Sequence, residues 1–468
     1  MLSLLDYGIV FLFFCGLTIF GLYQGRYNQT AEDYFLAGRS IPWPITMFSI
    51  VATETSVLTF ISIPGLAYKS NWLFLQLALG YIVGRILVSV VLLPTYFSDG
   101  VVSIYETLGR KFGPKVQKIA SFVFFLTRVL ADGVRFLATG VIVQVVTGWS
   151  LPVSVLSIGL ITLIYASLGG IRAVVWVDGF QFILYLVGGL ISIYYLFSFI
   201  DMPVIQVYEL LISAEKLQFF QIRGSIFSEP FLFINALIGG IFLSFASHGA
   251  DYMMVQRVIS TKDLSSAKKA MIGSGFFILF QFAIFLTIGS LMFIYFNGFE
   301  IEKDREFPTF IVNHLPIGVK GILIAGVLSA AMSTISSSIN SLASSVVNDW
   351  LGGAVSLKKS KLISLGWGLI LITIALFFDE SNTSIVLIGL QVASFTYGGL
   401  LGLFLLSKLE QNLNTISLIA GLLSSLLIVF YLKQIGLAWT WFIFISVLFN
   451  ILITLSCERL INLKKVLK

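Results

Sequence analysis

Long apolar stretches separated by short polar connections run through almost the whole chain. A stretch of about 20 apolar residues has the length that an α-helix needs to cross the hydrocarbon core of a bilayer. Thirteen such stretches lie near residues 4–23, 45–66, 72–97, 117–147, 151–169, 174–198, 231–255, 271–297, 317–347, 361–378, 383–407, 414–432 and 438–457. The pattern predicts an all-α polytopic membrane protein with thirteen transmembrane helices.

Composition supports this class. Of the 468 residues, 57% are hydrophobic and 11% are charged, which excludes a soluble globular protein. Cys15 and Cys457 lie near opposite ends and His248 and His314 are far apart, so neither a disulfide framework nor a zinc site is expected. The first stretch has no basic segment before it and no small-residue cleavage site, so we expect a retained helix.

The charges in the connections predict an orientation. The formal net charge of +6 reflects basic inner connections rather than nucleic-acid binding. Basic residues gather in 98–118, 256–270, 349–361 and the carboxy-terminal tail, whereas 199–230 and 298–316 lean acidic. The positive-inside rule then places the amino terminus outside and the carboxy terminus in the cytoplasm of a plasma or bacterial inner membrane. An odd number of helices requires the same arrangement.

The stretch 49–65 is apolar at both ends but polar in the middle, at Ala52-Thr53-Glu54-Thr55-Ser56. A charge at mid-membrane costs about 2.5–3.5 kcal/mol even on lenient insertion scales. We therefore predict a helix that is broken around a bound ion or solute. The alternative is an ordinary spanning helix whose Glu54 pairs with an arginine elsewhere in the bundle.

A second polar interruption, Ser244 to Asp251, lies in the first member of a later helix group. The predicted spans form two groups of five, 45–198 and 231–407, which enter the membrane from opposite sides. Matching interruptions in two inverted halves point to a transporter's midplane site, although small residues also serve ordinary helix contacts. The remaining segments are a peripheral amino-terminal part (1–44), an extracellular loop (199–230) and two peripheral helices with the tail (408–468).

One predicted helix carries a polar face. At 100° per residue, six side chains fall within an arc of roughly 80°: Ser329, Ser333, Ser336, Ser337, Asn340 and Ser344. Hydroxyls that bond back to their own helix would explain two or three of them. The whole set favours an ion-binding surface, to which the carbonyls of an unwound 52–56 segment add further oxygens. Such an uncharged shell suits Na⁺ better than Ca²⁺.

The stretch 117–147 contains Arg128, Asp132 and Arg135 on one helix face with Thr139. One interpretation is an internal ladder of ion pairs, in which Asp132 neutralises one arginine and Glu54 the other. The other leaves one guanidinium free to hold a solute carboxylate. Asp178 is similarly open: it either caps a helix or helps to bind a second cation with Ser336 and Ser337.

Several motifs give the chain a resemblance to the sodium:solute symporters, which include the bacterial proline permease and the sodium/galactose and sodium/sialic acid transporters. They are Ala37-Gly38-Arg39-Ser40, Pro64-Gly65, Gly169-Gly170-Ile171-Arg172-Ala173-Val174-Val175-Trp176-Val177-Asp178, Gly249-Ala250-Asp251, Val255-Gln256-Arg257 and Ala330-Ala331-Met332-Ser333-Thr334. The resemblance implies an inverted five-plus-five (LeuT-type) fold with broken first and sixth core helices. It covers essentially the whole chain.

The resemblance also implies sites. The core sodium site would comprise Ala52, Thr55, Ala330, Ser333 and Thr334, and a second sodium site Asp178, Ser333, Ser336 and Ser337. The candidate solute-binding residues are Glu54, Ser56, Thr59, Gln76, Arg128, Arg135, Ser244, Ser247, His248 and Gln391. Thr59, Ser244, Ser247 and His248 replace the galactose transporter's substrate residues, which argues against a simple hexose.

We therefore expect a sodium-coupled symporter, a monomer or loose homodimer in the lipid bilayer, that imports a small organic solute, with Na⁺ as the coupling ion. A carboxylate-bearing solute is favoured over a neutral sugar, polyol or amino acid. A passive channel and a transporter-like sensor are the alternatives from other classes. No nucleophile–base pair or cofactor motif points to an enzyme.

Overall fold

The computed structural model describes residues 2–55, 57–377 and 385–466. In these ranges the chain is helical and contains no named strand, so the predicted all-α class is confirmed. The long helices are α1 (Leu4–Gly25), α3 (Trp43–Glu54), α4 (Val57–Lys69), α5 (Leu75–Leu87), α8 (Pro114–Thr147), α9 (Leu151–Phe199), α11 (Phe233–Gly249), α13 (Leu264–Tyr295), α15 (Val319–Ser345), α16 (Leu357–Ala375), α17 (Ile385–Leu406), α18 (Thr415–Gln434) and α19 (Phe442–Val466).

Shorter helices connect them. These are α2 (Ala31–Leu36), α6 (Leu93–Asp99), α7 (Tyr105–Phe112), α10 (Val204–Ser213), α12 (Tyr252–Ile259) and α14 (Glu306–His314). Within the described ranges, seven helices are long and apolar enough to cross a membrane, or nine if each bent pair counts as one span. The multi-pass architecture is therefore confirmed at this coarser level.

Two of the predicted spans follow each other without a loop. The ranges 151–169 and 174–198 both lie in α9, where the non-helical backbone of Gly170 separates two helical segments at a kink. Gly170 has φ +65°, a left-handed conformation that glycine adopts without steric cost. Its α-carbon also lies against Tyr34, where an added methyl group would meet the Tyr34 carbonyl oxygen at 2.7 Å. The bend thus requires this residue.

Both predicted helix interruptions are present. The axes of α3 and the following α4 segment differ by 59°, and those of α11 and α12 by 62°. The helix α3 ends at Thr55, whose backbone is no longer helical (φ −85°, ψ 60°). At the second break, Asp251 begins α12 as its N-cap, and its side chain accepts a hydrogen bond of 3.0 Å from the amide of Met253.

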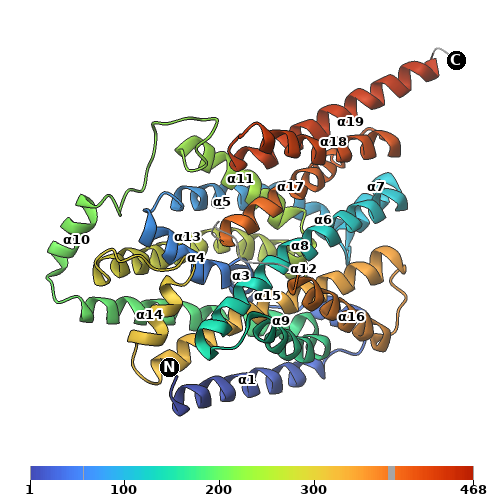
Figure 1. Cartoon of the computed structure of the whole chain (residues 1–468). Helices are drawn as coiled ribbons and strands as arrows, with labels where there is room; N and C mark the ends of the chain where they lie inside the picture. The colour runs from blue at the N-terminus through green and yellow to red at the C-terminus, as the bar shows by residue number, and fades with distance from the viewer. Residues whose placement is uncertain (1, 56, 378–384, 467–468) are drawn as a thin grey trace.

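The serine-rich α15 lies inside the bundle. Every residue from 323 to 345 is buried. The helix contacts α1, α3, α8, α9 and α16. Figure 1 shows these helices arranged around it. A helix that is surrounded by protein can carry polar side chains at membrane depth without exposing them to lipid, which explains why a hydroxyl-rich sequence is tolerated here.

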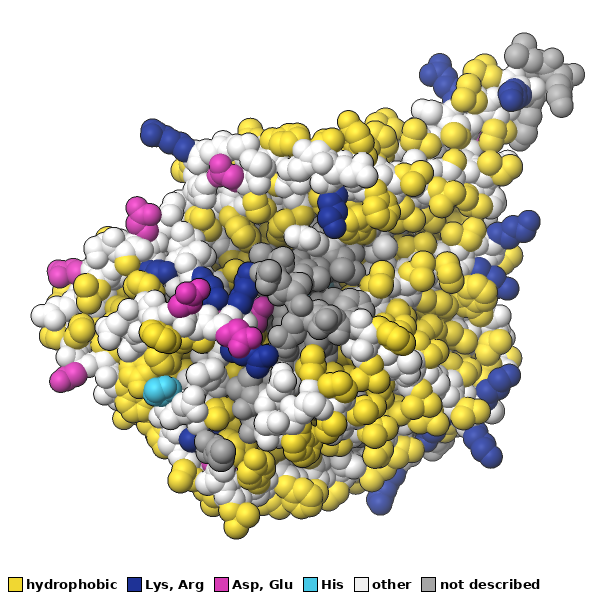
Figure 2. All heavy atoms as spheres, in the orientation of Figure 1, with side chains coloured by type: hydrophobic (Ala, Val, Ile, Leu, Met, Phe, Trp, Pro, Cys, Tyr) yellow, Lys and Arg dark blue, Asp and Glu magenta, His cyan; other side chains and the backbone are white. Residues whose placement is uncertain are grey.

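The termini and surface charges are distributed unevenly. The amino terminus lies on the side of α10 and α14, and the carboxy terminus lies on the opposite side (Figure 1). Figure 2 shows acidic side chains toward the α10 and α14 side, with lysine and arginine side chains along the opposite edge. This asymmetry agrees with the charge pattern from which the orientation was predicted.

The helices α5 and α11 approach closely because glycines line their contact. A methyl group added to Gly80 would touch the carbonyl oxygen of Leu237 and lie 2.8 Å from the amide nitrogen of Ile241. Gly240 faces the carbonyl oxygen of Leu77 in the same way. The backbone of one helix thus occupies the space that a side chain on the other would need.

We predict that Gly80→Ala lowers thermal stability, because separating the two backbones costs about 1–3 kcal/mol. Gly366→Ala on α16 is the matched control, since nothing lies within 4 Å of the added methyl group there. Thermal unfolding of the purified variants in detergent measures the effect. Equal melting temperatures for the two variants would show that the α5–α11 contact does not need this glycine.

Candidate sodium and solute site

The break between α3 and α4 lies against the middle of α15. The hydroxyl of Thr334 donates a hydrogen bond of 3.4 Å to the backbone carbonyl of Thr53. Ala52 and Thr55 lie on either side of Thr53, and Ala330 lies one helical turn from Thr334; all are buried. The structure therefore brings the two segments of the predicted core sodium site together.

The oxygens in this region suit a monovalent cation. A helix that stops at a break leaves carbonyl groups without their usual amide partners, and buried carbonyls need another partner. Hard cations prefer such oxygen ligands. Among the described residues there is no group of three or more His, Cys, Asp or Glu side chains that could hold a metal ion. The predicted shell of carbonyls and hydroxyls, which carries no formal charge, fits Na⁺ in this setting.

Asp178 on α9 lies directly beside the break. It accepts hydrogen bonds from Ser49 (2.7 Å) and Thr53 (3.2 Å) on α3 and from Ser333 on α15. The carboxylate therefore joins three helices around the predicted sodium site. Asp178 does not cap a helix, because the side chains that donate hydrogen bonds to it lie on other helices.

Arg257 also reaches Asp178, a contact that the sequence analysis did not foresee. Its Nη2 lies 3.4 Å from Asp178 Oδ2, its Nε donates to Ser49 Oγ at 2.9 Å, and it contacts Ser337. The sequence analysis assigned Arg257 to a basic inner connection; this was wrong, since the residue is helical and buried in α12. The residues of the predicted second sodium site thus lie around the Arg257 guanidinium, which already balances the charge of the Asp178 carboxylate.

Glu54 pairs with Arg85 on α5, and its Oε2 lies 3.5 Å from His248 Nε2 on α11. The expectation that Glu54 neutralises an arginine of α8 is therefore wrong. The helix is broken, as predicted, and of the alternative interpretation only the pairing of Glu54 with an arginine elsewhere in the bundle holds. Arg85 was missed although it is a charged residue inside a predicted span, which is itself a signal for a buried ion pair.

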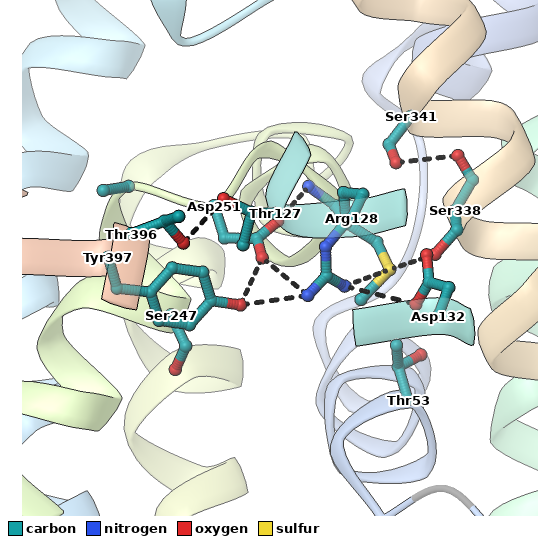
Figure 3. Close-up of polar contacts among 12 residues, drawn as sticks. Thr53, Thr127, Arg128, Asp132, Ser247, Asp251, Ser338, Ser341, Thr396 and Tyr397 are labelled. Carbon is teal, nitrogen blue, oxygen red and sulfur yellow. Dashed lines mark hydrogen bonds and ion pairs between the residues drawn. The ribbon is translucent and has the colours of Figure 1, made fainter. Parts of the chain in front are cut away.

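Figure 3 shows the charged cluster on α8. Arg128 lies 3.3 Å from Asp251 Oδ2, 3.8 Å from Asp132 Oδ1 and 3.0 Å from the Tyr397 hydroxyl, and its side chain is 1% exposed. Arg135 lies 3.3 Å from the same Asp132 oxygen and is 17% exposed. Arg128 is thus enclosed by partners that fix the second helix break, whereas Arg135 keeps accessible surface.

The other predicted solute residues differ in their surroundings. The amide of Gln76 donates to Phe231 O at 2.8 Å and accepts from Gln221 N at 3.3 Å, so it holds the connection between α10 and α11. Ser244 donates to Tyr81 O at 3.1 Å and joins α11 to α5. Ser247 lies 2.8 Å from His248 Nδ1. Two further residues, Thr59 and Gln391, are buried and half-buried, and Ser56 lies outside the described residues.

The polar face of α15 divides into two parts. Ser336 and Ser337 donate to the carbonyl of Ser333 in their own helix, at 2.9 and 2.7 Å. Asn340 accepts from Gln256 at 2.9 Å, and Ser344 lies 2.7 Å from the Tyr252 hydroxyl. Hydrogen bonds within the protein thus engage the carboxy-terminal part of this face, and ion binding around Ser333 and Thr334 stays a prediction.

Comparison with known proteins gives consistent matches. The model of the "Sodium:solute symporter family" matches residues 34–423. The sodium/sialic acid symporters NanT of Aliivibrio fischeri and SiaT of Proteus mirabilis are each 28% identical to this chain, covering 92% and 91% of it and 88% of each relative. The human sodium/iodide cotransporter is 27% identical, covering 89% of this chain and 68% of that protein.

Solved structures agree with the sequence matches. A substrate-bound, outward-open Na⁺-coupled sialic acid symporter superposes with a TM-score of 0.88 at 25% identity, covering 98% of both chains. The nucleobase-cation-symport transporter Mhp1 superposes with a TM-score of 0.62 at 16% identity, covering 91% of this chain and 93% of that one, which shows a shared fold. The family match spans most of the chain, and this protein therefore belongs to the sodium:solute symporter family.

Proposed function

We propose that this protein imports a small carboxylate-bearing solute together with Na⁺ by alternating access. Its family makes Na⁺ the coupling ion and a small solute the cargo. The observation that carries the proposal is the contact between Thr53 at the first break and Thr334 on α15, and the bundle also contains a partly exposed arginine, Arg135. In this proposal the chain has thirteen spans, ten of which form two inverted groups of five, and its amino terminus lies outside.

The charges of the bundle explain why ion and solute would bind together. Four arginines and four carboxylates pair within it: Arg85 with Glu54, Arg257 with Asp178, and Arg128 and Arg135 with Asp132 and Asp251. Na⁺ alone would leave one uncompensated positive charge, and an anionic solute alone one negative charge. Because an unbalanced buried charge costs several kcal/mol, each ligand favours the binding of the other.

Arg135 is the better candidate to hold the solute carboxylate. Its contact with Asp132 uses Nη1, so the other edge of its planar fork is available to a second carboxylate. The sialic acid and iodide carried by the named relatives are anions, which supports an anionic cargo here. A neutral sugar, polyol or amino acid is the alternative, in which the Arg135–Asp132 pair would hydrogen-bond to both donors and acceptors.

In the proposed cycle, Na⁺ bridges the α3–α4 break and α15 and so favours the outward-facing state. Arg257 ties α3 to α9 and α12 through Ser49 and Asp178; these contacts would separate when the inner half-helices move. One Na⁺ entering down about 100 mV and a tenfold gradient supplies about 3.7 kcal/mol. An anion carried with one Na⁺ is electroneutral, so the voltage term disappears and a second Na⁺ would matter more.

We predict that Arg135→Gln weakens binding of an anionic solute by about tenfold to a hundredfold, because a charge-assisted hydrogen bond contributes about 1.5–3 kcal/mol. Calorimetry with N-acetylneuraminate and then other carboxylates, in saturating Na⁺, measures the effect. Lys115→Gln at the exposed start of α8 is the control. Unchanged affinity for every anionic ligand of the wild type would refute the role of Arg135.

We predict that Thr334→Val weakens Na⁺ binding by about tenfold, since the variant keeps the shape of the side chain and loses one oxygen ligand. The Na⁺ concentration that gives half-maximal thermal stabilisation reports the change. Ser341→Ala is the control, because this hydroxyl on the same helix donates to its own helix carbonyl of Ser338. If both variants respond to Na⁺ like the wild type, the core sodium site lies elsewhere.

We predict that Asp178 and Arg257 are energetically coupled, which a double-mutant cycle can measure. Asp178→Asn or Arg257→Gln alone leaves a buried charge without its partner, which costs about 3–5 kcal/mol. The double variant removes both charges and should recover a large part of the lost stability. Denaturation midpoints of the four proteins test this coupling, and strictly additive losses would show that the two side chains do not interact.

A further inference from the structure

A groove in the membrane-facing surface lies between α1, α3 and α9. Its volume is about 430 Å³, and its lining is almost entirely apolar, with Leu12, Gly16 and Phe20 on α1, Ile45 on α3, and Trp176 and Phe180 on α9. The helices α1 and α9 run side by side in Figure 1. At membrane depth such a groove is filled by lipid or by another apolar segment.

A basic and aromatic cluster adjoins one end of the groove. Tyr23 lies one turn beyond Phe20 on the same face of α1, Tyr27 follows in the turn after this helix, and Arg172 lies one turn from Trp176 on α9. The Arg26 guanidinium lies 5.7 Å from the Tyr23 ring centroid, and that of Arg172 lies 5.4 Å from the Tyr27 ring centroid. The two tyrosine hydroxyls are 3.4 Å apart. The four side chains therefore form one continuous patch.

The positive charge of this patch has no internal counter-charge. In the described part of the chain, neither Arg26 nor Arg172 forms an ion pair with a carboxylate. Arg172 is held in place by hydrogen bonds from Nη2 to Ala37 O (2.8 Å) and Ser40 Oγ (2.9 Å), and Arg26 is exposed. Tyrosines mark the membrane–water interface, and basic pockets between transmembrane helices bind anionic lipid head groups.

We propose that this groove is a binding site for one anionic phospholipid, with an acyl chain between α1 and α9 and its phosphate at Arg26 and Arg172. The charge of the patch selects an anionic lipid over a zwitterionic one, and the adjoining groove selects a lipid over a free phosphate. This site does not depend on the identity of the transported solute.

The position of the site connects it to transport. Ile45 belongs to the inner half-helix α3, and Val177 and Gly179 in the groove wall flank Asp178 on α9. A lipid in the groove therefore contacts both elements that Asp178 joins through Ser49. Occupancy by an anionic lipid would stabilise this arrangement of α3 and α9.

The test uses the full chain in nanodiscs of phosphatidylcholine with increasing phosphatidylglycerol. Native mass spectrometry counts retained phosphatidylglycerol, and thermal unfolding measures its stabilising effect. Arg26→Gln should weaken the apparent phosphatidylglycerol affinity by about fivefold, since one basic residue near an anionic surface contributes about 1 kcal/mol. Lys358→Gln, which removes an exposed lysine from α16, is the control and should leave it unchanged.

Filling the groove provides an independent variant. A β-carbon added at Gly16 meets nothing within 4 Å, and the groove beside it has room for a larger side chain, so we expect Gly16→Leu to fold and to occupy the space of the acyl chain. Gly8→Leu, also on α1 with open space around it, is the matched control. We expect Gly16→Leu to lose the retained lipid and Gly8→Leu to keep it.

Three results would overturn the proposal. The first is equal stabilisation of the wild type by phosphatidylcholine and phosphatidylglycerol. The second is full phosphatidylglycerol binding by both Arg26→Gln and Gly16→Leu. The third is a lipid-independent dimer that Gly16→Leu dissociates, which would assign the groove to a second copy of this chain. Each outcome is measured without solute uptake. The experiment can therefore reject the lipid site while the proposed transport function holds, and a failure of the transport function leaves the lipid result unchanged.

Discussion

The pairing of arginines with carboxylates in a medium of low dielectric constant governs the centre of this helix bundle. Arginines and carboxylates stand at membrane depth on α3, α5, α8, α9 and α12, and each has an opposite charge within reach. An uncompensated charge there costs several kcal/mol. The pairs therefore fix how the helices pack, and they also leave a neutral framework in which, under the proposed function, a cation and an anionic solute would balance each other.

The pairs also connect the two helix breaks to the surrounding bundle. Asp178 on α9 binds the first break through Ser49 and Thr53, while Arg128 on α8 binds the second through Asp251. In each case a charged residue of a continuous helix holds the end of a half-helix. A half-helix is a short rigid element with one free end, so movement of a few residues at the break can reorient it. In the proposed alternating-access cycle, the contacts that stabilise the observed state would therefore be exchanged for others.

The sequence predicted the positions of the breaks better than the partners of the charges. Polar residues inside apolar stretches mark where a helix cannot continue, so 52–56 and 244–251 could be found from pattern alone. Pairing depends on three-dimensional proximity. The positions of Arg85 and Arg257 in the sequence do not indicate which carboxylate each one contacts. Gln76 and Ser244 were assigned to the solute through resemblance, which gives a position on a helix but not the direction of the side chain. In the structure both side chains donate hydrogen bonds to backbone carbonyls of other segments.

Arg257 bears on the number of sodium ions. Its guanidinium and a second Na⁺ would both be attracted to Asp178, and two cations at one carboxylate repel each other strongly where water is scarce. A second ion could therefore enter only as Arg257 withdraws, and the withdrawal would also release Ser49 on α3 and Ser337 on α15. Binding of that ion would then be coupled directly to the freedom of the inner half-helix. Whether the chain carries one or two Na⁺ is, in this view, a property of the Arg257 contacts more than of the serines around Asp178.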